Sequence, residues 1–579
     1  MRLSRVLAAC GATVLVTAGL AGTAGADSAS AKVVHTGTKD NYLVLTKSAA
    51  GADSVAAKLR SQGATVTSVN NDVGMVVVKS DDANFRDNAG AVNGVKGVAA
   101  DRVIGKAPAR DKKSIEQEHL QAIKSGNAPS ARKSAARVDG PGADPLDGNL
   151  WGMRMIKADQ AHTRTLGNRR VKVGIMDTGV QADVPDIHPN FDYRASRNFT
   201  TDIRGVDGEG CEVVNSCVDY VGTDDNGHGT HVAGTVAAAM NGFGLSGVAP
   251  KATIVEVRAG QDSGYFFAGP TVNALTYSGD AGLDVVNMSF YVDPWLYNCV
   301  GGAPEDNDMQ AMDQAVIIET MTRALNYAHR KGVTLVGAAG NSNLDMSDPP
   351  VDETSPDFPA DAAYPRTIDN DTCKDLPVEG PHVLGITALG PSGKKSDFSN
   401  WTEEPRSGEV ELSAPGGWLR DGFGTASFRT YSNTILSTYP VEVLKEEELV
   451  DASGNPTPAG DAAGVLKRCQ TSPAPGTQAC GYYAWLQGTS MASPHAAGVA
   501  ALAVGAHGRV QRRSGYGMKP DAVRRLLMRT ATDHTCPPGG VQKYLDEGRD
   551  ATYTATCVGS AERNGFYGAG IVNASGVVR

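Results

Sequence analysis

The chain has 579 residues, long enough for a substantial core, and a formal net charge of −10. Residues 1–145 carry 19 Lys and Arg against 13 Asp and Glu, which leaves 35 against 51 for residues 146–579. So acidic a body excludes nucleic acid as an expected partner, and no apolar run after the N-terminus is long enough to predict a membrane span.

The first 26 residues predict a secretory signal peptide, and therefore a secreted, extracellular protein. Two arginines in residues 2–5 precede an apolar and small-residue run over 6–20, and residues 24–26 read Ala-Gly-Ala, a small-residue cleavage site. Residues 7–10, Leu-Ala-Ala-Cys, resemble a lipoprotein cleavage box instead. That alternative leaves almost no apolar core before the cysteine, so cleavage after Ala26 is favoured.

Residues 27–105 contain no cysteine and predict a small α+β domain. The predicted elements are strands at 42–46, 65–69, 74–78 and 95–104, and helices at 54–62 and 83–89. Their βαββαβ order predicts a ferredoxin-like sandwich. Residues 106–145 are polar and rich in Ala, Lys, Arg and Gly, which predicts an exposed linker and a natural place for processing.

Residues 146–579 predict one large α/β domain. Near-continuous apolar runs indicate buried parallel strands at 171–176, 253–257, 285–288 and 334–338. Helical stretches such as 231–240 and 317–329 separate the strands. The alternation predicts a parallel sheet with helices on both faces.

Three segments of this domain each carry one side chain suited to catalysis. Asp177 ends the strand at 171–176, at the edge where active sites of parallel sheets gather. His228 ends a glycine-rich loop, and His231 follows on the next helix. Two histidines three apart also suggest metal, but zinc needs a third protein ligand. Ser490 precedes a small-residue helix at 492–505, where backbone N–H groups and the helix dipole stabilise an oxyanion. Taken singly, Asp177 is more typical of a turn, and Ser490 is as typical of a helix cap.

The order Asp177, His228, Ser490 resembles the subtilisin-like serine proteases, the subtilases of peptidase family S8. An ordered series of matching blocks spans residues 150–575. The blocks are Gly-Ile-Met-Asp-Thr-Gly (174–179), His-Gly-Thr-His-Val-Ala-Gly-Thr (228–235), Gly-Val-Ala-Pro (247–250), Asp-Val-Val-Asn-Met-Ser (284–289), Ala-Ala-Gly-Asn (338–341), Leu-Ser-Ala-Pro-Gly (412–416), Gly-Thr-Ser-Met-Ala-Ser-Pro-His (488–495) and Tyr-Gly-Ala-Gly-Ile-Val-Asn (567–573).

The resemblance implies a serine endopeptidase that works through an acyl-enzyme and needs no cofactor for its chemistry. Ser490 would be the nucleophile, His228 the general base, and Asp177 the residue that orients and stabilises the imidazolium. Asn341 matches the side-chain donor of the oxyanion hole, and His231 matches a structural histidine. The implied substrate-groove residues are Ser289, Phe290, Tyr291, Ala338, Ala339 and Gly340.

Specificity is where the chain departs from the family pattern. Phe290-Tyr-Val stands where Leu-Gly-Gly is usual, and insertions at 293–316, 342–376 and 440–482 surround the expected cleft. We expect broad specificity with an apolar or aromatic residue before the scissile bond, and interpret the acidic run at 446–448 as a solvated face. Alternatives are a dedicated maturation protease for one partner peptide and a catalytically inactive binding protein.

The resemblance also implies a self-processing precursor. Its parts would be a signal peptide (1–26), an inhibitory propeptide domain (27–105), a linker and processing region (106–145) and a subtilisin-like catalytic domain (146–579). The propeptide would cover the active site, assist folding and be cut away by the enzyme itself. The mature enzyme is expected to be a monomer without a membrane anchor.

A structural calcium ion is a further implication of the resemblance. Asn190 and Asn241 align with side-chain ligands of the family's tight site, and the carbonyls of Ala239, Phe243 and Leu245 would complete it. Because Asn190 stands where Asp is common, an ordinary turn is the alternative.

The cysteines predict disulfides in an exported protein. Nine are present, and removing Cys10 leaves eight, none in a Cys-x-x-Cys metal motif. Eight cysteines allow 105 pairings. Short loops favour three pairs and leave the fourth by remainder: Cys211–Cys217, Cys469–Cys480 and Cys536–Cys557, then Cys299–Cys373.

Overall fold

The computed structural model describes ten stretches of the chain. They are residues 40–101, 116–118, 120, 144–203, 207, 216–349, 351–357, 362–471, 478–511 and 515–579. The predicted signal peptide, most of the predicted linker and Cys211 lie outside these stretches. Within them, no helix combines the length and apolarity that crossing a bilayer requires.

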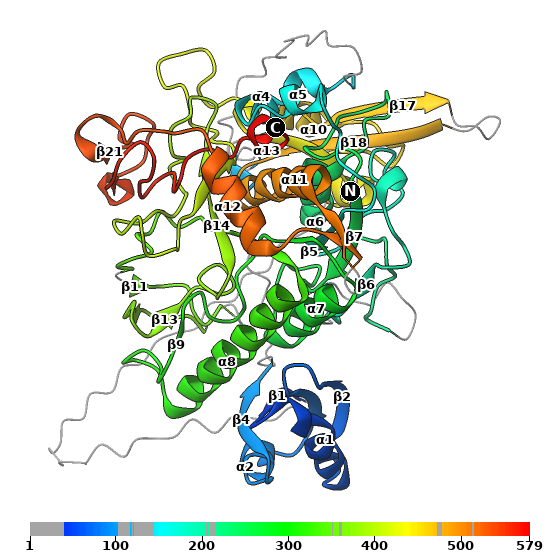
Figure 1. Cartoon of the computed structure of the whole chain (residues 1–579), viewed down its shortest axis with the longest axis vertical. Helices are drawn as coiled ribbons and strands as arrows, with labels where there is room; N and C mark the ends of the chain where they lie inside the picture. Colours follow the sequence, from blue (N-terminus) through cyan, green and yellow to red (C-terminus); the bar gives the residue numbers. More distant parts are fainter. Residues whose placement is uncertain are drawn as a thin grey trace, which may run out of the picture. The chain divides into compact units, whose positions relative to one another are not determined.

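A seven-stranded parallel sheet forms the centre of residues 144–579, as predicted (Figure 1). Its order is β15-β14-β10-β8-β5-β7-β6. The strands are β5 (Lys172–Met176), β6 (Arg197–Asn198), β7 (Thr253–Arg258), β8 (Val285–Met288), β10 (Thr334–Ala338), β14 (Val383–Leu389) and β15 (Leu412–Pro415).

Helices cover both faces of this sheet. Among them are α6 (His228–Ala237), α7 (Ala268–Asp280), α8 (Asp308–Lys331), α11 (Thr489–His507) and α12 (Pro520–Thr530). The other helices of this part of the chain are the short α4 (Trp151–Met155), α5 (Ala158–His162), α9 (Val441–Glu446), α10 (Pro458–Ala463) and α13 (Ala574–Val577). Helix α8 begins earlier than the predicted 317–329, because Asn307 and Gln310 form a capping box at its start.

The seven-stranded sheet has one apolar core on each of its two faces, because side chains alternate between the faces along each strand. Val173 and Ile175 of β5 pack with α6, α11 and α12, whereas Met176 packs with α7 and α8. Successive residues of a strand point to opposite faces, so both sides must be apolar when both are covered. The strands therefore read as continuous apolar runs.

An antiparallel sheet of three strands leads into the Ser490 segment. It consists of β16 (Ile435–Tyr439), β17 (Leu466–Thr471) and the central β18 (Gln478–Leu486), and it includes much of the predicted insertion at 440–482. The remaining strands are short: β9 (Asn298–Cys299), β11 (Val351–Asp352), β12 (Arg366–Thr367), β13 (Cys373–Lys374), β19 (Arg509–Gln511), β20 (Gly515–Gly517), β21 (Val541–Gln542) and β22 (Ala555–Thr556).

Residues 40–100 form the predicted βαββαβ unit. Its elements are β1 (Asp40–Thr46), α1 (Ala52–Ser61), β2 (Thr65–Asn70), β3 (Met75–Ser80), α2 (Phe85–Gly90) and β4 (Val95–Ala100). The antiparallel sheet has the order β2-β3-β1-β4, which is that of a ferredoxin-like sandwich. The last strand ends at Ala100, and Asp101 is already outside it; positions 102–104 of the predicted strand lie outside the described residues.

The open face of this small sheet packs against helices α7 and α8. Tyr42 and Val44 of β1 face the unit's own helices, whereas Leu43 and Leu45 join the core that contains α7 and α8.

Polar contacts border this apolar contact. Arg86 donates to both carboxylate oxygens of Asp313 on α8 at 2.6 and 2.9 Å. The Lys96 ammonium lies 3.1 Å from the Glu319 carboxylate. Both pairs join a cation of the small unit to an acid of α8, in agreement with the opposite net charges of the two parts of the chain.

Three of the predicted disulfides are present: Cys299–Cys373, Cys469–Cys480 and Cys536–Cys557. Cys217 is also disulfide-bonded, and its predicted partner lies outside the described residues.

Candidate functional site

Asp177 and His228 meet at the carboxyl end of β5. The Asp177 carboxylate is fully buried, and its Oδ1 lies 2.7 Å from Nδ1 of His228. The same oxygen accepts the backbone N–H of Thr178 at 2.9 Å. This contact holds the proton on Nδ1 of a neutral imidazole, which leaves Nε2 as the basic nitrogen.

The glycine after His228 makes the contact possible. A Cβ at Gly229 would lie 2.0 Å from the carbonyl oxygen of Gly179. Only a residue without a side chain therefore lets the start of α6 approach the turn that follows Asp177. This is a physical reason for the glycine in the His-Gly-Thr-His sequence.

Ser490 is the second residue of helix α11. It is 5% exposed, and its Oγ donates to the carbonyl of Ser289 at 3.4 Å. The Ser289 hydroxyl in turn bonds the carbonyl of Ser490 at 3.1 Å and the hydroxyl of Ser493 at 2.7 Å. The structure thus brings Ser289, predicted at the end of another strand, to the base of the helix that carries Ser490.

The side chain of Asn341 lies at the start of helix α11, next to the residue that precedes Ser490. Its Oδ1 accepts both the backbone N–H and the hydroxyl of Thr489, each at 2.9 Å. Two donors at the oxygen fix the orientation of the amide, so Nδ2 is the group presented beside Ser490. Gly340 has φ +100°, and a Cβ there would lie 2.4 Å from Nδ2 of Asn400, so the turn that presents Asn341 requires glycine.

Two other histidines near the site are structural. His231 on α6 bonds the carbonyl of Ile435 at 3.0 Å, and burial lowers its pKa to about 3. His495 on α11 bonds the carbonyl of Met491 at 2.8 Å, and burial lowers its pKa to about 4. Both side chains are buried and neutral at physiological pH, which agrees with leaving His231 out of the predicted triad.

These histidines predict a loss of stability in acid. In the unfolded chain they bind protons near pH 6.5, but in the native state His495 does so only near pH 4. The unfolded state therefore binds more protons between these values, and its free energy falls relative to the native state as pH drops, by roughly 1.4 kcal/mol per pH unit for each histidine. We expect His495→Gln to reduce this slope in urea unfolding from pH 6.5 to 4.5, measured in a Ser490→Ala background to prevent autolysis.

The comparison with the unsubstituted background isolates the histidine. Buried acids act in the opposite direction; burial raises the pKa of Glu256 to about 8, so it favours the native state in acid and this contribution is lost as pH rises. Equal slopes with and without His495 would contradict the prediction.

The predicted groove residues differ in what they contact. The Phe290 ring stacks on Phe266 with centroids 4.0 Å apart and planes 1° apart. The Tyr291 hydroxyl donates to the Asp357 carboxylate, so its polar end is held by the segment at 351–357. Ala338 and Ala339 are buried at the end of β10, next to Gly340.

Residues 116–118 and 120 lie against the large domain, and Glu116 contacts Asn341, which the sequence did not predict. Glu116 accepts a hydrogen bond from Nδ2 of Asn341 at 3.0 Å, and its carbonyl accepts the N–H of Gln487 at 3.2 Å. Leu120 is 8% exposed and belongs to the core of the large domain. The prediction of an exposed linker is therefore wrong for these residues; their polar sequence has no apolar periodicity that could have revealed the contact.

The two asparagines among the predicted calcium ligands make hydrogen bonds of their own, but the buried Oδ1 of Asn190 has no hydrogen-bond partner among the described residues. Asn190 donates its amide N–H groups to the carbonyls of Ala237 and Pro250, each at 2.8 Å. The Asn241 amide donates to Asp186, and its oxygen accepts the N–H of Phe243 at 3.0 Å.

Carboxylates hold the rest of this loop through N–H groups. Asp186 accepts the backbone N–H of Leu245, Asp144 accepts that of Gly242, and Ala239 donates to the carbonyl of Asp186. Calcium at these residues stays a prediction, because of the two asparagines only Asn190 has a side-chain oxygen left without a partner among the described residues for the hard cation to bind. No step at Ser490 requires an ion there.

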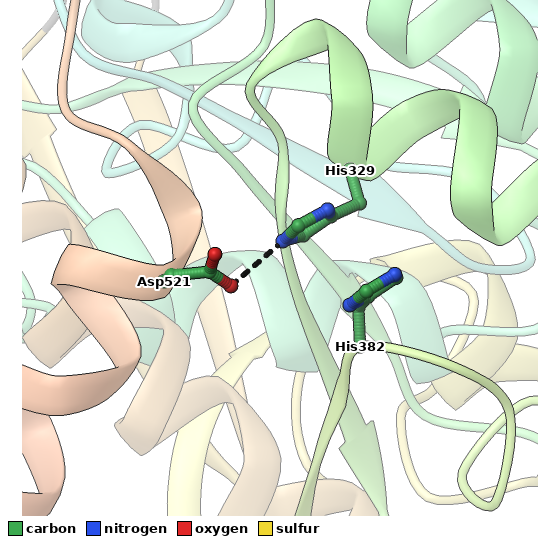
Figure 2. A group of neighbouring side chains, drawn as sticks. All are labelled: His329, His382 and Asp521. Atoms are coloured by element: carbon green, nitrogen blue, oxygen red, sulfur yellow. Dashed lines mark hydrogen bonds and ion pairs between the residues drawn. The ribbon is translucent and has the colours of Figure 1, made fainter.

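Two other groups of metal-ligating side chains occur among the described residues. His329, His382 and Asp521 gather at the surface (Figure 2). The imidazole rings stack with centroids 3.7 Å apart and planes 6° apart, so their nitrogen lone pairs run parallel and do not converge.

The second group, Asp202, Asp219 and Asp262, surrounds a buried arginine. The Arg258 guanidinium bonds these carboxylates at 3.3, 2.6 and 2.8 Å. Because Arg258 already contacts all three carboxylates, and the two stacked imidazoles of the first group do not converge, we assign no metal to either group.

Comparison with known proteins agrees with this geometry. Residues 168–570 match the Peptidase S8 model of the subtilase family, and the chain belongs to that family. Thermitase of Thermoactinomyces vulgaris is 27% identical over 289 residues, 50% of this chain and 77% of thermitase. Subtilisin DY of Bacillus licheniformis is 27% identical over 352 residues, 61% of this chain and 83% of that protein.

Solved structures share the fold. The epidermin leader peptide processing serine protease of Staphylococcus aureus superposes with a TM-score of 0.59 at 18% identity, covering 93% of this chain and 98% of that chain. Fervidolysin of Fervidobacterium pennivorans gives a TM-score of 0.51 at 20% identity, covering 94% and 62%. The protein is thus a serine endopeptidase with the subtilisin-like fold.

Proposed function

We propose that Ser490 is the nucleophile, His228 its general base and Asp177 the residue that orients the imidazole. The observation that carries the proposal is the 2.7 Å contact from Asp177 Oδ1 to His228 Nδ1, which leaves Nε2 to accept a proton. Attack by Ser490 on a peptide carbonyl creates an oxyanion. Asn341 Nδ2 and the backbone N–H of Ser490 at the start of α11 are the donors that would stabilise it.

Covalent labelling tests this assignment. The processed enzyme is treated with a serine-directed phosphonyl reagent, digested and analysed by mass spectrometry. We expect one adduct, on Ser490, with loss of casein hydrolysis in the same proportion. Ser493→Ala is the matched control, because Ser493 lies on the same helix and bonds Ser289. Labelling at another serine, or hydrolysis that survives complete labelling, would refute the assignment.

We further propose that the protein is secreted as a self-processing precursor inhibited by its own N-terminal part. Support comes from the packing of residues 40–100 on α7 and α8 and from the contact of Glu116 with Asn341. A carboxylate on the amide nitrogen of Asn341 occupies the donor that a substrate oxyanion would need. The precursor would therefore be unable to stabilise a transition state until this segment leaves.

Loss of the Glu116 carboxylate is expected to shorten the inactive phase of the precursor. A hydrogen bond to a charged group contributes about 1.5–3 kcal/mol, so we expect Glu116→Ala to shorten the lag before hydrolysis of a fluorogenic peptide by roughly 10-fold. Gln117→Ala is the control, since Gln117 pairs with Glu447 rather than with a catalytic residue. Equal lags in the two variants would argue against inhibition through Asn341.

For the processed enzyme we propose general endopeptidase activity on protein substrates, with an apolar or aromatic residue before the scissile bond. The Phe290–Phe266 stack beside Ser289 supports an apolar surface in this part of the groove. Profiling of a peptide library tests the preference; a dominant Arg or Lys before the cleaved bond would overturn it.

A further inference from the structure

Two arginines hold a carboxylate close to the proposed oxyanion donors. Arg420 lies 2.7 Å and Arg549 3.3 Å from the carboxylate of Glu118. The side-chain amide of Gln487 donates to the same carboxylate at 2.9 Å. The Glu118 side chain is 12% exposed and each arginine 14%, so the ion pairs are largely removed from water.

The catalytic domain itself holds this arginine pair, Arg420 and Arg549, in place. Arg420 donates to the carbonyl of Glu547 at 2.9 Å. Arg549 donates to the fully buried carboxylate of Asp397 at 2.5 Å and lies over the Tyr553 ring, 4.8 Å from its centroid. Side chains anchored in this way present their remaining N–H groups to a carboxylate without having to reorganise.

The ion pairs of this site set two cations against one acid of the catalytic domain. The arginine pair carries two positive charges, and Asp397 behind it supplies one negative charge. Glu118 supplies the second. Because a partly buried cation without a counter-charge is costly, departure of Glu118 leaves a site that favours another carboxylate.

Gln487 connects this site to the segment of chain that carries Ser490. Its backbone N–H binds the carbonyl of Glu116, the residue two before Glu118, and it lies three residues before Ser490. Glu116 itself reaches the Asn341 amide. A bound peptide that followed the same path as residues 116–118 would therefore place one side chain where Glu116 lies. The side chain two residues later would reach the arginine pair, as Glu118 does.

We propose that the arginine pair is a substrate subsite for an acidic side chain, occupied in the precursor by Glu118. This proposal rests on the proposed protease function. It adds a preference for an acidic substrate residue, which the apolar groove at Phe290 does not explain. Peptides with Glu or Asp at one position near the scissile bond are the substrate class.

Cleavage of paired peptides by the processed enzyme tests the subsite. The two peptides of a pair differ only at one position, which is Glu in one peptide and Gln in the other. A separate pair is made for each position on both sides of the cleaved bond. A charged hydrogen bond contributes about 1.5–3 kcal/mol, so at one position we expect Glu to raise kcat/KM roughly 10-fold or more over Gln. Arg420→Gln should bring this ratio close to one, whereas Arg525→Gln, at an exposed position on α12, should leave it unchanged.

The ratio is taken within one enzyme preparation, so partial misfolding of a variant does not affect it. Ratios near one at every position in the wild type, or a ratio that survives Arg420→Gln, would overturn the subsite. Failure to cleave any peptide would contradict the protease proposal instead. In that case, a Ser490→Ala chain cut by an added protease in the predicted processing region (106–145) and freed of its N-terminal part reads the subsite without turnover. Equal affinity of a fluorescent Glu peptide and its Gln counterpart for this protein would overturn the subsite.

Discussion

Replacing Ser490 with alanine is expected to abolish both peptide hydrolysis and maturation. Loss of the nucleophile lowers kcat by about a million-fold in subtilisin, and the same scale is expected here because the oxygen that forms the acyl bond is removed. The variant should accumulate as a chain that retains residues 27–145. N-terminal sequencing and casein hydrolysis measure the two effects separately.

The matched control keeps the helix intact while changing a neighbouring hydroxyl. Ser493→Ala removes the partner of Ser289 at the base of the same helix, and it should still process itself and cleave casein. If Ser490→Ala matured in the absence of active enzyme, another residue would have to be the nucleophile.

Replacing Asn341 with alanine is expected to lower kcat by about 100- to 1,000-fold with little change in KM, the size of effect seen when an oxyanion donor is lost in a subtilisin. The reason is geometric. Asn341 Oδ1 is held by both donors of Thr489, the residue before Ser490, so Nδ2 is the group that the amide would offer to the proposed oxyanion. A donor that acts mainly in the transition state affects kcat more than substrate binding.

Asn341→Asp refines the test, because the carboxylate keeps acceptors for Thr489 but cannot donate to an oxyanion. It should be as impaired as Asn341→Ala, whereas Asn455→Ala, an exposed asparagine in the loop before α10, should be unaffected. A rise in KM at constant kcat would mean that Asn341 binds substrate and transition state equally, and would count against its role as oxyanion donor.

The local sequence predicted secondary structure correctly where a short segment has a regular pattern of apolar residues. The apolar runs at 171–176 and 334–338 predicted buried parallel strands because both faces of the sheet are covered. The alternation in residues 40–100 likewise predicted the βαββαβ unit. The capping box at Asn307 explains why helix α8 begins earlier than predicted, since the polar residues after it gave no clear apolar period. Helices α6 and α11 likewise begin three residues before their predicted starts at 231 and 492, at His228 and Thr489.

Contacts between distant loops could not be predicted in the same way. Glu116 and Asn341 are separated by 225 positions, and Glu118 lies 302 positions from Arg420. Each of these residues, taken alone, is typical of a solvated surface. Their pairing depends on how the chain returns to the carboxyl edge of the sheet, and no local pattern encodes that path.

Residue order alone was therefore sufficient for the family and the layered α/β architecture, and it predicted the Asp177, His228 and Ser490 set, because chemistry at a strand end or helix start needs particular residues in immediate succession. Only the tertiary structure shows which residues from distant parts of the chain contact the proposed site. Glu116 binds the amide of Asn341, and Glu118 lies between Arg420 and Arg549. Burial makes the difference, since removal of a carboxylate from water penalises it strongly unless packing also supplies a specific partner.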